Sequence, residues 1–148
     1  MRAVLQRVKQ ASVSVDGERV GSINKGILIL LCVEEGDTAQ DMDYMERKIP
    51  TLRIFPDEEQ HMNLSVTDVE GEILLISQFT LAGDARRGTR PSYSDAARPE
   101  TAQGMYDEMA VRLSRYVPVK KGVFGADMQV SLVNDGPVTL LLDSRKRF

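Results

Sequence analysis

The sequence predicts a mixed α/β fold, a single domain with a barrel-like sheet of about seven strands and two main helices packed on it. Strand-like patterns dominate both ends of the chain, an unbroken apolar run at 26–33 is typical of a strand covered on both faces, and two stretches carry apolar residues at helical spacing. The 148 residues, 42% of them apolar, suffice for one core, and no linker or repeat divides them. Residues 1–148 are therefore expected to form one domain.

The first part of the chain is expected to form strands. Residues 2–8 and 11–15 have strand-like patterns, and Asp16-Gly17 is a hairpin-type turn into the returning segment 18–23. The run 26–33 should follow at the centre of the sheet, because a strand buried on both faces has no polar alternation.

The first helix is expected to end near Lys48. Asp37 and Thr38 can cap its amino end, and Pro50 marks its termination because proline cannot continue a helix. One stripe of this helix should be buried: Met42, Met45 and Ile49. A short strand at 52–55 and a polar loop should follow.

The second half of the chain again alternates between strand and helix. Residues 72–80 are strand-like, and a loop at 83–99 leads to a helix with Pro99 near its start. The face of this helix expected in the core consists of Ala102, Met105, Tyr106, Met109, Leu113 and Tyr116. The chain should end in a strand at 128–133, a turn at 134–137 and a returning strand at 138–143.

Charge is nearly balanced, with 19 basic and 22 acidic residues and a net charge of −3. This balance argues against a general nucleic-acid binder, which usually has a basic excess. Three basic clusters stand out: Arg86, Arg87 and Arg90; Lys120 and Lys121; and Arg145, Lys146 and Arg147. Each is expected to be a solvated face or tail, although together they could hold a short piece of phosphate backbone.

The single cysteine and single histidine exclude several kinds of site. Cys32 lies in an apolar run, so we expect a small core residue and neither a disulfide nor a thiolate zinc site. His61 lies in a polar stretch and is expected to be a solvated loop residue. No metal site is expected. The amino terminus lacks a signal-peptide core, and the run 26–33 is far shorter than the ~20 residues of a membrane span, so a cytoplasmic protein is expected.

Three polar stretches are candidates for a functional site. Residues 77–82 close an apolar strand with Ser, Gln and Thr, 134–139 contain a flexible Gly before a rigid Pro, and 90–93 form a stiff basic turn. The simpler interpretations are a strand that reaches the surface and a plain hairpin turn. No P-loop or dinucleotide-binding pattern supports ATP or NAD chemistry, and a Ser-His-Asp triad would have to use His61.

The motifs resemble those of one known family. SQFTLA (77–82), RPSY (90–93), FGADM (124–128) and NDGPVT (134–139), with the opening MRAVLQRV, look like the D-aminoacyl-tRNA deacylases, formerly D-tyrosyl-tRNA deacylases. The resemblance covers essentially the whole chain. It implies hydrolysis of the ester of D-aminoacyl-tRNA, and of mischarged glycyl-tRNA, as translation quality control without a cofactor.

The resemblance also implies a homodimer with its active sites at the subunit interface. The Gly136-Pro137 peptide would be cis and would enter the site of the partner subunit, where its carbonyls exclude an L side chain. Arg7 matches the arginine that holds this element. Val138 and Thr139 complete the group of residues implied in chiral selection.

The catalytic site implied by the resemblance contains Ser77, Gln78, Phe79 and Thr80. Gln78 and the Phe79 N–H would position the ester and stabilise negative charge, while the terminal adenosine's 2′-hydroxyl activates water. Phe124 and Met128 match the residues that cradle the adenine; without the resemblance both would be read as core. The arginines implied as contacts to the tRNA acceptor end are Arg86, Arg87 and Arg90. No membrane or DNA partner is implied.

Two other functions remain open at this point. The chain could be a non-catalytic dimeric module that binds RNA or nucleotides on the same fold. It could also be a serine esterase, provided that Ser77 and His61 meet in space.

Overall fold

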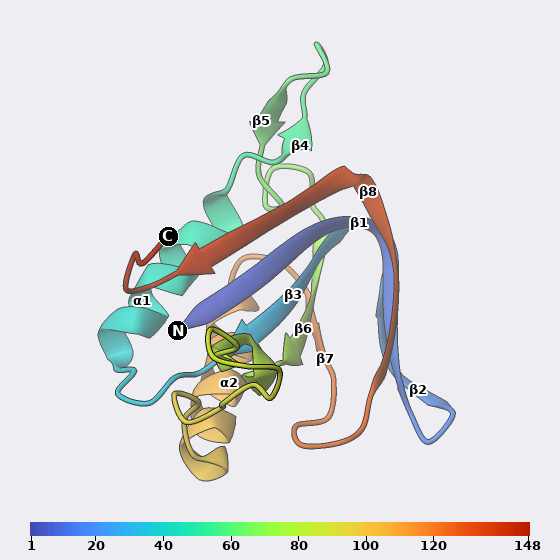
Figure 1. Ribbon diagram of the computed structural model, residues 1–148. Helices are drawn as coiled ribbons and strands as arrows, with labels where there is room; N and C mark the ends of the chain where they lie inside the picture. The colour runs from blue at the N-terminus through green and yellow to red at the C-terminus, as the bar shows by residue number, and fades with distance from the viewer.

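A long, bent first strand organises the sheet in the computed structural model, which describes residues 1–148 (Figure 1). The first half of β1 (Arg2–Val15) pairs with β3 (Gly26–Cys32) and its second half with β2 (Glu18–Ile23), both antiparallel. On its other side, β1 pairs with β8 (Gln129–Asp143) along nearly its whole length. The two ends of the chain thus form one long ribbon.

Parallel pairing extends the sheet on the far side of β3. There, β3 pairs with β6 (Glu72–Ser77), and β6 pairs with β7 (Val119–Lys121), which gives the order β2-β1-β3-β6-β7. The sheet curls until β2 approaches β7: a Cβ added at Gly21 would stand 2.9 Å from the Lys121 carbonyl oxygen. The prediction of a mixed α/β domain with a barrel-like sheet is confirmed.

Two helices pack on this sheet. α1 (Ala39–Lys48) begins with a capping box between Thr38 and Asp41, and a 3-10 turn, η1 (Ile49–Thr51), follows it. Pro50 therefore lies within η1, just past the end of α1. α2 (Pro99–Leu113) begins with proline at its first turn.

Both helices cover one main core. The stripe predicted for the first helix is buried, and of the face predicted for the second, Ala102, Tyr106, Met109 and Leu113 are buried. Met105 is only partly buried, and Tyr116, beyond the end of α2, is 42% exposed. The periodic pattern thus outlasted the helix by about one turn.

Several predicted boundaries were wrong. Residues 2–8 and 11–15 belong to one strand, since β1 runs unbroken. Residues 52–54 are not a strand, because their backbone turns out of η1; only β4 (Phe55–Pro56) pairs, with β5 (Met62–Leu64), in a small hairpin. The strand predicted at 72–80 ends at Ser77, and a 3-10 turn, η2 (Phe79–Ala82), follows.

The predicted turn at 134–137 does not reverse the chain. β8 continues through it in the same direction, and the extra residues form a bulge: Val8 pairs with Asn134 and Gln6 with Thr139, so two steps on β1 correspond to five on β8. Gly and Pro accordingly mark a break in strand pairing here and not a hairpin.

No helix in the structure is both long and apolar enough to span a membrane.

Candidate functional site

A cavity of about 740 Å³ opens where β6 ends. Its walls come from three segments: the end of β6 and the start of η2, the loop before α2, and the chain between β7 and β8. Residues of these segments that line it include Ser77, Gln78 and Phe79; Tyr93, Ser94 and Arg98; and Phe124, Asp127 and Met128. Most of the lining is apolar, and a few polar groups stand at the carboxyl end of a parallel strand, which is typical of a binding site in an α/β fold.

The polar groups of this cavity are held by the turn that follows β6. The Gln78 backbone N–H donates to the Leu31 carbonyl at 2.8 Å, so the turn stays joined to β3. The Gln78 side-chain amide donates to the Thr80 hydroxyl oxygen at 2.6 Å. Ser77, Gln78 and Phe79 line the cavity, whereas Thr80 does not and is exposed.

The Phe79 ring is unusually exposed for its size, at 57%. Its one aromatic neighbour is Tyr93, whose ring meets it edge-on with centroids 5.4 Å apart. The two rings together form an apolar rim on the cavity that a flat or apolar ligand can contact.

Phe124 and Met128 line the cavity from the segment between β7 and β8. Both are partly buried and both line the cavity, with the Phe124 ring 6.0 Å from that of Tyr106 in the core. A Cβ added at Gly122 would stand 2.6 Å from the Met128 sulfur, so glycine at 122 leaves room for this side chain. An aromatic ring and a thioether at the edge of the core form a surface suited to stacking a base.

The Gly136–Pro137 peptide, which is cis, lies in the bulge of β8, and both of its residues are exposed. Arg7 holds the bulge from beneath: its Nε donates to the Asp135 carbonyl at 3.1 Å, and its Nη1 donates to the Ile54 carbonyl at 2.6 Å. Only 9% of Arg7 is exposed. Its guanidinium therefore joins the bulge to the segment after α1.

Side-chain hydrogen bonds close the bulge from above. The side-chain amide nitrogen of Asn134 donates to the Thr139 hydroxyl oxygen at 3.0 Å, and its side-chain oxygen Oδ1 accepts from the Val138 N–H at 3.1 Å. The residues on both sides of Gly136 and Pro137 are thus held by hydrogen bonds, and the Gly-Pro pair projects from the strand.

The structure does not bring this bulge to the cavity of the same chain. Strand register places Arg7 level with Ile27 and Ile73, four residues before Leu31 and Ser77 at the cavity. That is about 13 Å along the strands, and the three strand spacings from β8 to β6 add about 14 Å across the sheet. Figure 1 shows the bend of β8 and the end of β6 at opposite ends of the sheet.

The arginine cluster lies on the exposed loop that leads into the cavity wall. Arg86 pairs with Asp84 through two hydrogen bonds of 2.9 and 2.7 Å, which lower the pKa of Asp84 to about 2. Arg87 and Arg90 are exposed and make no ion pair within the chain. Two guanidinium groups on this loop are therefore free to contact an anion.

Sequence reasoning did not find the residues that attach this loop to the sheet. The Ala97 N–H donates to the Val33 carbonyl at 3.0 Å and the Glu35 N–H to the Asp95 carbonyl at 2.8 Å, which places Arg98 at the cavity. These contacts join residues about sixty positions apart, so no local sequence pattern predicts them.

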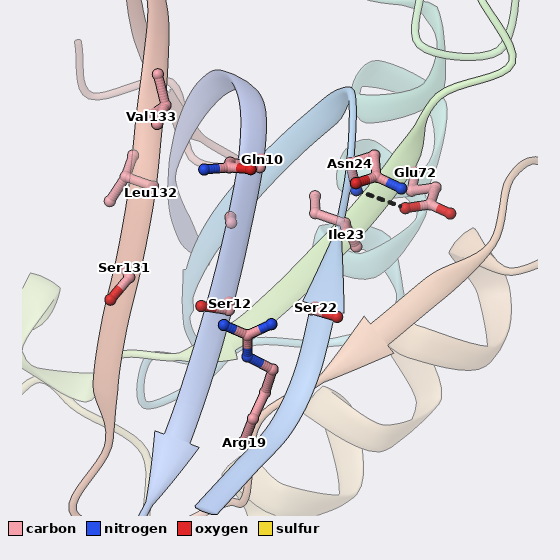
Figure 2. Close-up of a pocket in the computed structure, with 11 residues that line it drawn as sticks. Gln10, Ser12, Arg19, Ser22, Ile23, Asn24, Glu72, Ser131, Leu132 and Val133 are labelled. Atoms are coloured by element: carbon pink, nitrogen blue, oxygen red, sulfur yellow. Dashed lines mark hydrogen bonds between the residues drawn. The ribbon is translucent and has the colours of Figure 1, made fainter. Parts of the chain in front are cut away.

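A second hollow, of about 480 Å³, lies on the outer face of the sheet across β1, β2 and β8 (Figure 2). It is polar, with Gln10, Ser12, Arg19 and Ser22 among its lining residues. None of the site residues predicted from the sequence lies in it.

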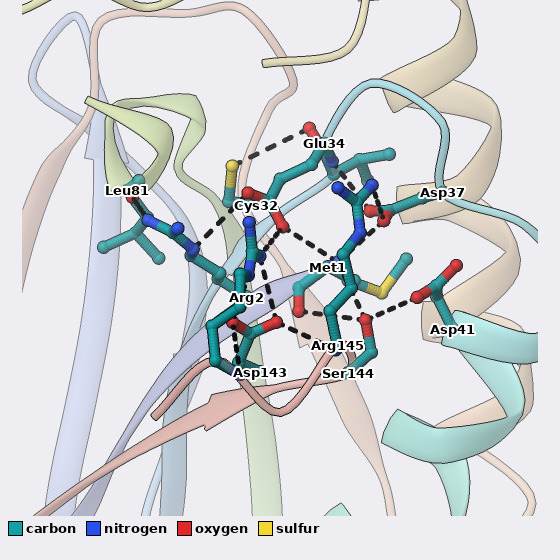
Figure 3. A network of polar contacts seen from close by, with 12 residues as sticks. Met1, Arg2, Cys32, Glu34, Asp37, Asp41, Leu81, Asp143, Ser144 and Arg145 are labelled. Atoms are coloured by element: carbon teal, nitrogen blue, oxygen red, sulfur yellow. Dashed lines mark hydrogen bonds and ion pairs between the residues drawn. The ribbon is translucent and has the colours of Figure 1, made fainter. Parts of the chain in front are cut away.

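The other basic clusters are largely occupied within the chain (Figure 3). Arg145 pairs with Asp37, Arg147 pairs with Glu34 and Asp143, and Lys121 pairs with Asp107. Arg145 and Arg147 are exposed, as expected for a solvated tail, but both pair with buried carboxylates and so are not free to hold a phosphate backbone.

The structure does not bring together the residues needed for a catalytic thiol, a metal site or a Ser-His-Asp triad. Cys32 is buried, and burial raises the pKa of its thiol to about 11. No group of three or more His, Cys, Asp or Glu side chains is placed to hold a metal ion. The His61 side chain is 74% exposed in the β4–β5 hairpin, at the other end of β6 from Ser77 (Figure 1), so the esterase pair does not form.

Comparison with known proteins agrees with the motifs at this site. The family model described as D-Tyr-tRNA(Tyr) deacylase matches residues 4–143. The chain belongs to the D-Tyr-tRNA deacylase family. As a member, it is a hydrolase that acts on the ester bonds of aminoacyl-tRNA, and the cavity contains residues of three of the four motifs that carried the resemblance.

Two solved structures show the same fold. One, titled "c-Myc DNA Unwinding Element Binding Protein", is 44% identical, covers 97% of this chain and 98% of its own, and has a TM-score of 0.92. The other, titled as a probable eukaryotic D-amino acid tRNA deacylase, is 17% identical, covers 95% of this chain and 97% of its own, and has a TM-score of 0.76. The deacylase-family fold therefore spans nearly the whole chain.

Proposed function

We propose that this deacylase releases D-amino acids from tRNA as a homodimer and rejects L-aminoacyl esters through the Gly136-Pro137 element of the partner subunit. The observation that carries the proposal is that the cavity and the Gly-Pro bulge lie far apart within one chain. The chain has a cavity lined by polar groups that include one carboxylate, Asp127, but no histidine, and an exposed Gly-Pro bulge too distant to reach that cavity. A second copy of the chain can bring the two together.

The cavity suits ester hydrolysis in which the substrate supplies the base. Gln78 and the Phe79 N–H position the carbonyl and stabilise the charge that develops on its oxygen. The 2′-hydroxyl of the terminal adenosine activates the water, which attacks the ester carbon as the 3′-oxygen leaves with a proton. Thr80 accepts a hydrogen bond from the Gln78 amide and acts as a positioning residue, and Ser77 lines the site.

Phe124 and Met128 provide the adenine platform in this proposal. They line the same cavity as Gln78, so a base stacked on them brings its ribose into the cavity that holds Gln78. Arg87 and Arg90, with Arg86 beside them, contact the phosphates of the acceptor end.

Selection against L-substrates needs no side-chain recognition. The Gly136 and Pro137 carbonyls, with Val138 and Thr139 behind them, occupy the space that an L side chain requires, while a D side chain points away. Glycine carries no side chain to exclude, so glycyl-tRNA is also a substrate.

Pro137→Ala tests the chiral element. We expect slower D-Tyr-tRNA hydrolysis, or a preference for D-Tyr-tRNA over L-Tyr-tRNA reduced by about tenfold or more, because a flexible element no longer excludes the L side chain. The matched control is Pro56→Ala, at an exposed proline in the β4–β5 hairpin. Unchanged rate and preference in a folded Pro137→Ala dimer would refute the role.

His61→Ala separates this mechanism from a serine esterase. The variant should retain wild-type deacylation, because the exposed imidazole lies far from Ser77. An inactive but folded His61→Ala protein would instead favour the esterase.

Binding of a nucleic acid other than tRNA, in addition to hydrolysis, is the second candidate function. The 44% identical structure bears the name of a protein that binds a DNA element. Against such a role here stand the net charge of −3 and the consumption of Arg145 and Arg147 in internal ion pairs. Binding of duplex DNA by the folded protein at physiological salt would establish this second role.

A further inference from the structure

The turn that carries Phe79 and Thr80 has few attachments of its own. Within η2 and its flanks, the Leu81 N–H donates to Gln78 at 3.3 Å and the Gly83 N–H donates to Thr80 at 2.9 Å. The Phe79 ring is 57% exposed, and Ala82 is the only buried side chain of η2, so side-chain packing fixes mainly the end of the turn. Its position must depend on contacts from the sheet beneath it.

Two such contacts come from residues paired across β1 and β3. Arg2 and Cys32 are direct cross-strand partners. The Arg2 Nη1 donates to the Leu81 carbonyl oxygen at 3.1 Å, and the Cys32 thiol donates to the Phe79 carbonyl oxygen at 3.5 Å. One pair of cross-strand residues, Arg2 and Cys32, therefore holds two alternate carbonyls of the active-site turn; Arg2, Cys32 and Leu81 are labelled in Figure 3.

A buried carboxylate orients the Arg2 side chain. The Arg2 Nε lies 3.4 Å from the Glu34 Oε1, and both atoms are buried without a hydrogen-bond partner. The other Glu34 oxygen accepts from the Met1 α-amino group at 3.1 Å and from Arg147. Burial opposes ionisation of Glu34, but these hydrogen bonds outweigh it and lower its pKa. A fixed negative charge thus holds the guanidinium so that one of its arms reaches the turn.

We propose that Arg2, held by Glu34, is a positioning residue of the active site: it fixes the 79–82 turn by its hydrogen bond to Leu81 without touching the substrate. The catalytic consequence rests on the proposed function. A charge-assisted hydrogen bond to a backbone carbonyl is directional, and it holds the turn at the distance from Gln78 that the reacting ester requires.

The test compares Arg2→Met and Arg2→Lys with Arg19→Met, a change at an exposed arginine on β2 far from the turn. We expect Arg2→Met to lower kcat for D-Tyr-tRNA by about tenfold, with KM within about twofold, because geometry at the ester is lost while the adenine platform is intact. Arg2→Lys keeps a charged donor and should recover most of the rate. Arg19→Met should match the wild type.

Amide hydrogen exchange provides a readout that does not require activity. In Arg2→Met, the Leu81 and Gly83 N–H groups should exchange about tenfold faster or more, while the Ile73 N–H, bonded to Pro118 at 2.9 Å in the sheet, should not change. Unchanged exchange and kcat in folded Arg2→Met, or equally faster exchange at all three amides, would overturn the positioning role. If the wild type hydrolyses no ester, the proposed function fails, while the exchange comparison still tests the turn.

Discussion

Gly136 shows how one residue can shape the candidate chiral element. Its φ of +131° is a conformation that L side chains rarely adopt, and an added Cβ would stand 2.9 Å from a Val138 methyl and 3.1 Å from the Arg7 Nη2. The bulge can therefore lie against the Arg7 guanidinium only because position 136 has no side chain.

Gly136→Ala is expected to lower the free energy of unfolding by about 1–3 kcal/mol, through backbone strain and the clash with Val138. The matched control is Gly104→Ala on α2, where nothing lies within 4 Å of an added Cβ, and which should raise it by about 0.5–1 kcal/mol. Urea unfolding measures both. Equal effects of the same sign at the two positions would contradict the assignment.

Asp143 makes the stability of the fold depend on pH in the acid range. Burial alone would raise the pKa of its carboxyl, but hydrogen bonds from Arg147, and from the backbone of Arg145, lower it from 3.8 to about 2. The ionised form is therefore favoured by folding. Its contribution is complete above the unfolded pKa of 3.8 and is lost as the pH falls through about 2.

Asp143→Asn should accordingly reduce the free energy of unfolding at pH 6, and the difference from the wild type should shrink by about 2 kcal/mol as the pH falls to about 2. Urea unfolding at several pH values measures the difference. Glu18→Gln, at an exposed carboxylate without an ion pair, is the control. A difference that does not vary with pH would show that the pairing with Arg147 is not the cause.

At the scale of elements, the residue pattern predicted the helices and strands whose formation depends on local side-chain periodicity. The buried stripes of α1 and α2 and the apolar β3 and β6 follow from side-chain periodicity, which is a local property. The Asn-Asp-Gly-Pro segment was misread because the same residues serve a hairpin and a bulge. Only the pairing of β8 with β1 on both sides of it distinguishes the two.

The candidate site was predictable in part for the same reason. Ser77, Gln78 and Phe79 could be placed at a strand end, and the resemblance indicated Phe124 and Met128 as residues that cradle the adenine; all five line the cavity. Arg98 and the turn's anchor Arg2 could not be found, because each reaches the site through contacts between distant parts of the chain.

A buried hydrogen bond joins α2 to the sheet, in addition to the packing of its apolar face. The Tyr106 hydroxyl donates to the Leu75 carbonyl at 2.6 Å, and burial raises its pKa to about 12. Tyr106→Phe should lower the free energy of unfolding by about 1–2 kcal/mol, because the bond is lost in the core. Tyr116→Phe, at an exposed ring, should change it little. Equal losses in urea unfolding of the two variants would contradict this reading.

At the scale of the whole molecule, the proposal requires two chains. Mixing Gln78→Ala subunits with Pro137→Ala subunits creates heterodimers in which one site has an intact pocket and an intact Gly-Pro element. After exchange, random pairing should restore about a quarter of the wild-type sites with wild-type preference for the D-ester. A mixture no better than the average of its two components would place both elements of each site in one subunit.

The most direct measurement is the release of tyrosine from D-Tyr-tRNA and, in parallel, from L-Tyr-tRNA by the purified wild-type protein. We predict rapid loss of the D-ester while the L-ester persists at its uncatalysed rate, because the Gly136-Pro137 carbonyls exclude only the L side chain. Hydrolysis of both esters would leave a deacylase without the chiral element. Hydrolysis of neither by folded, dimeric protein would contradict the proposed function itself.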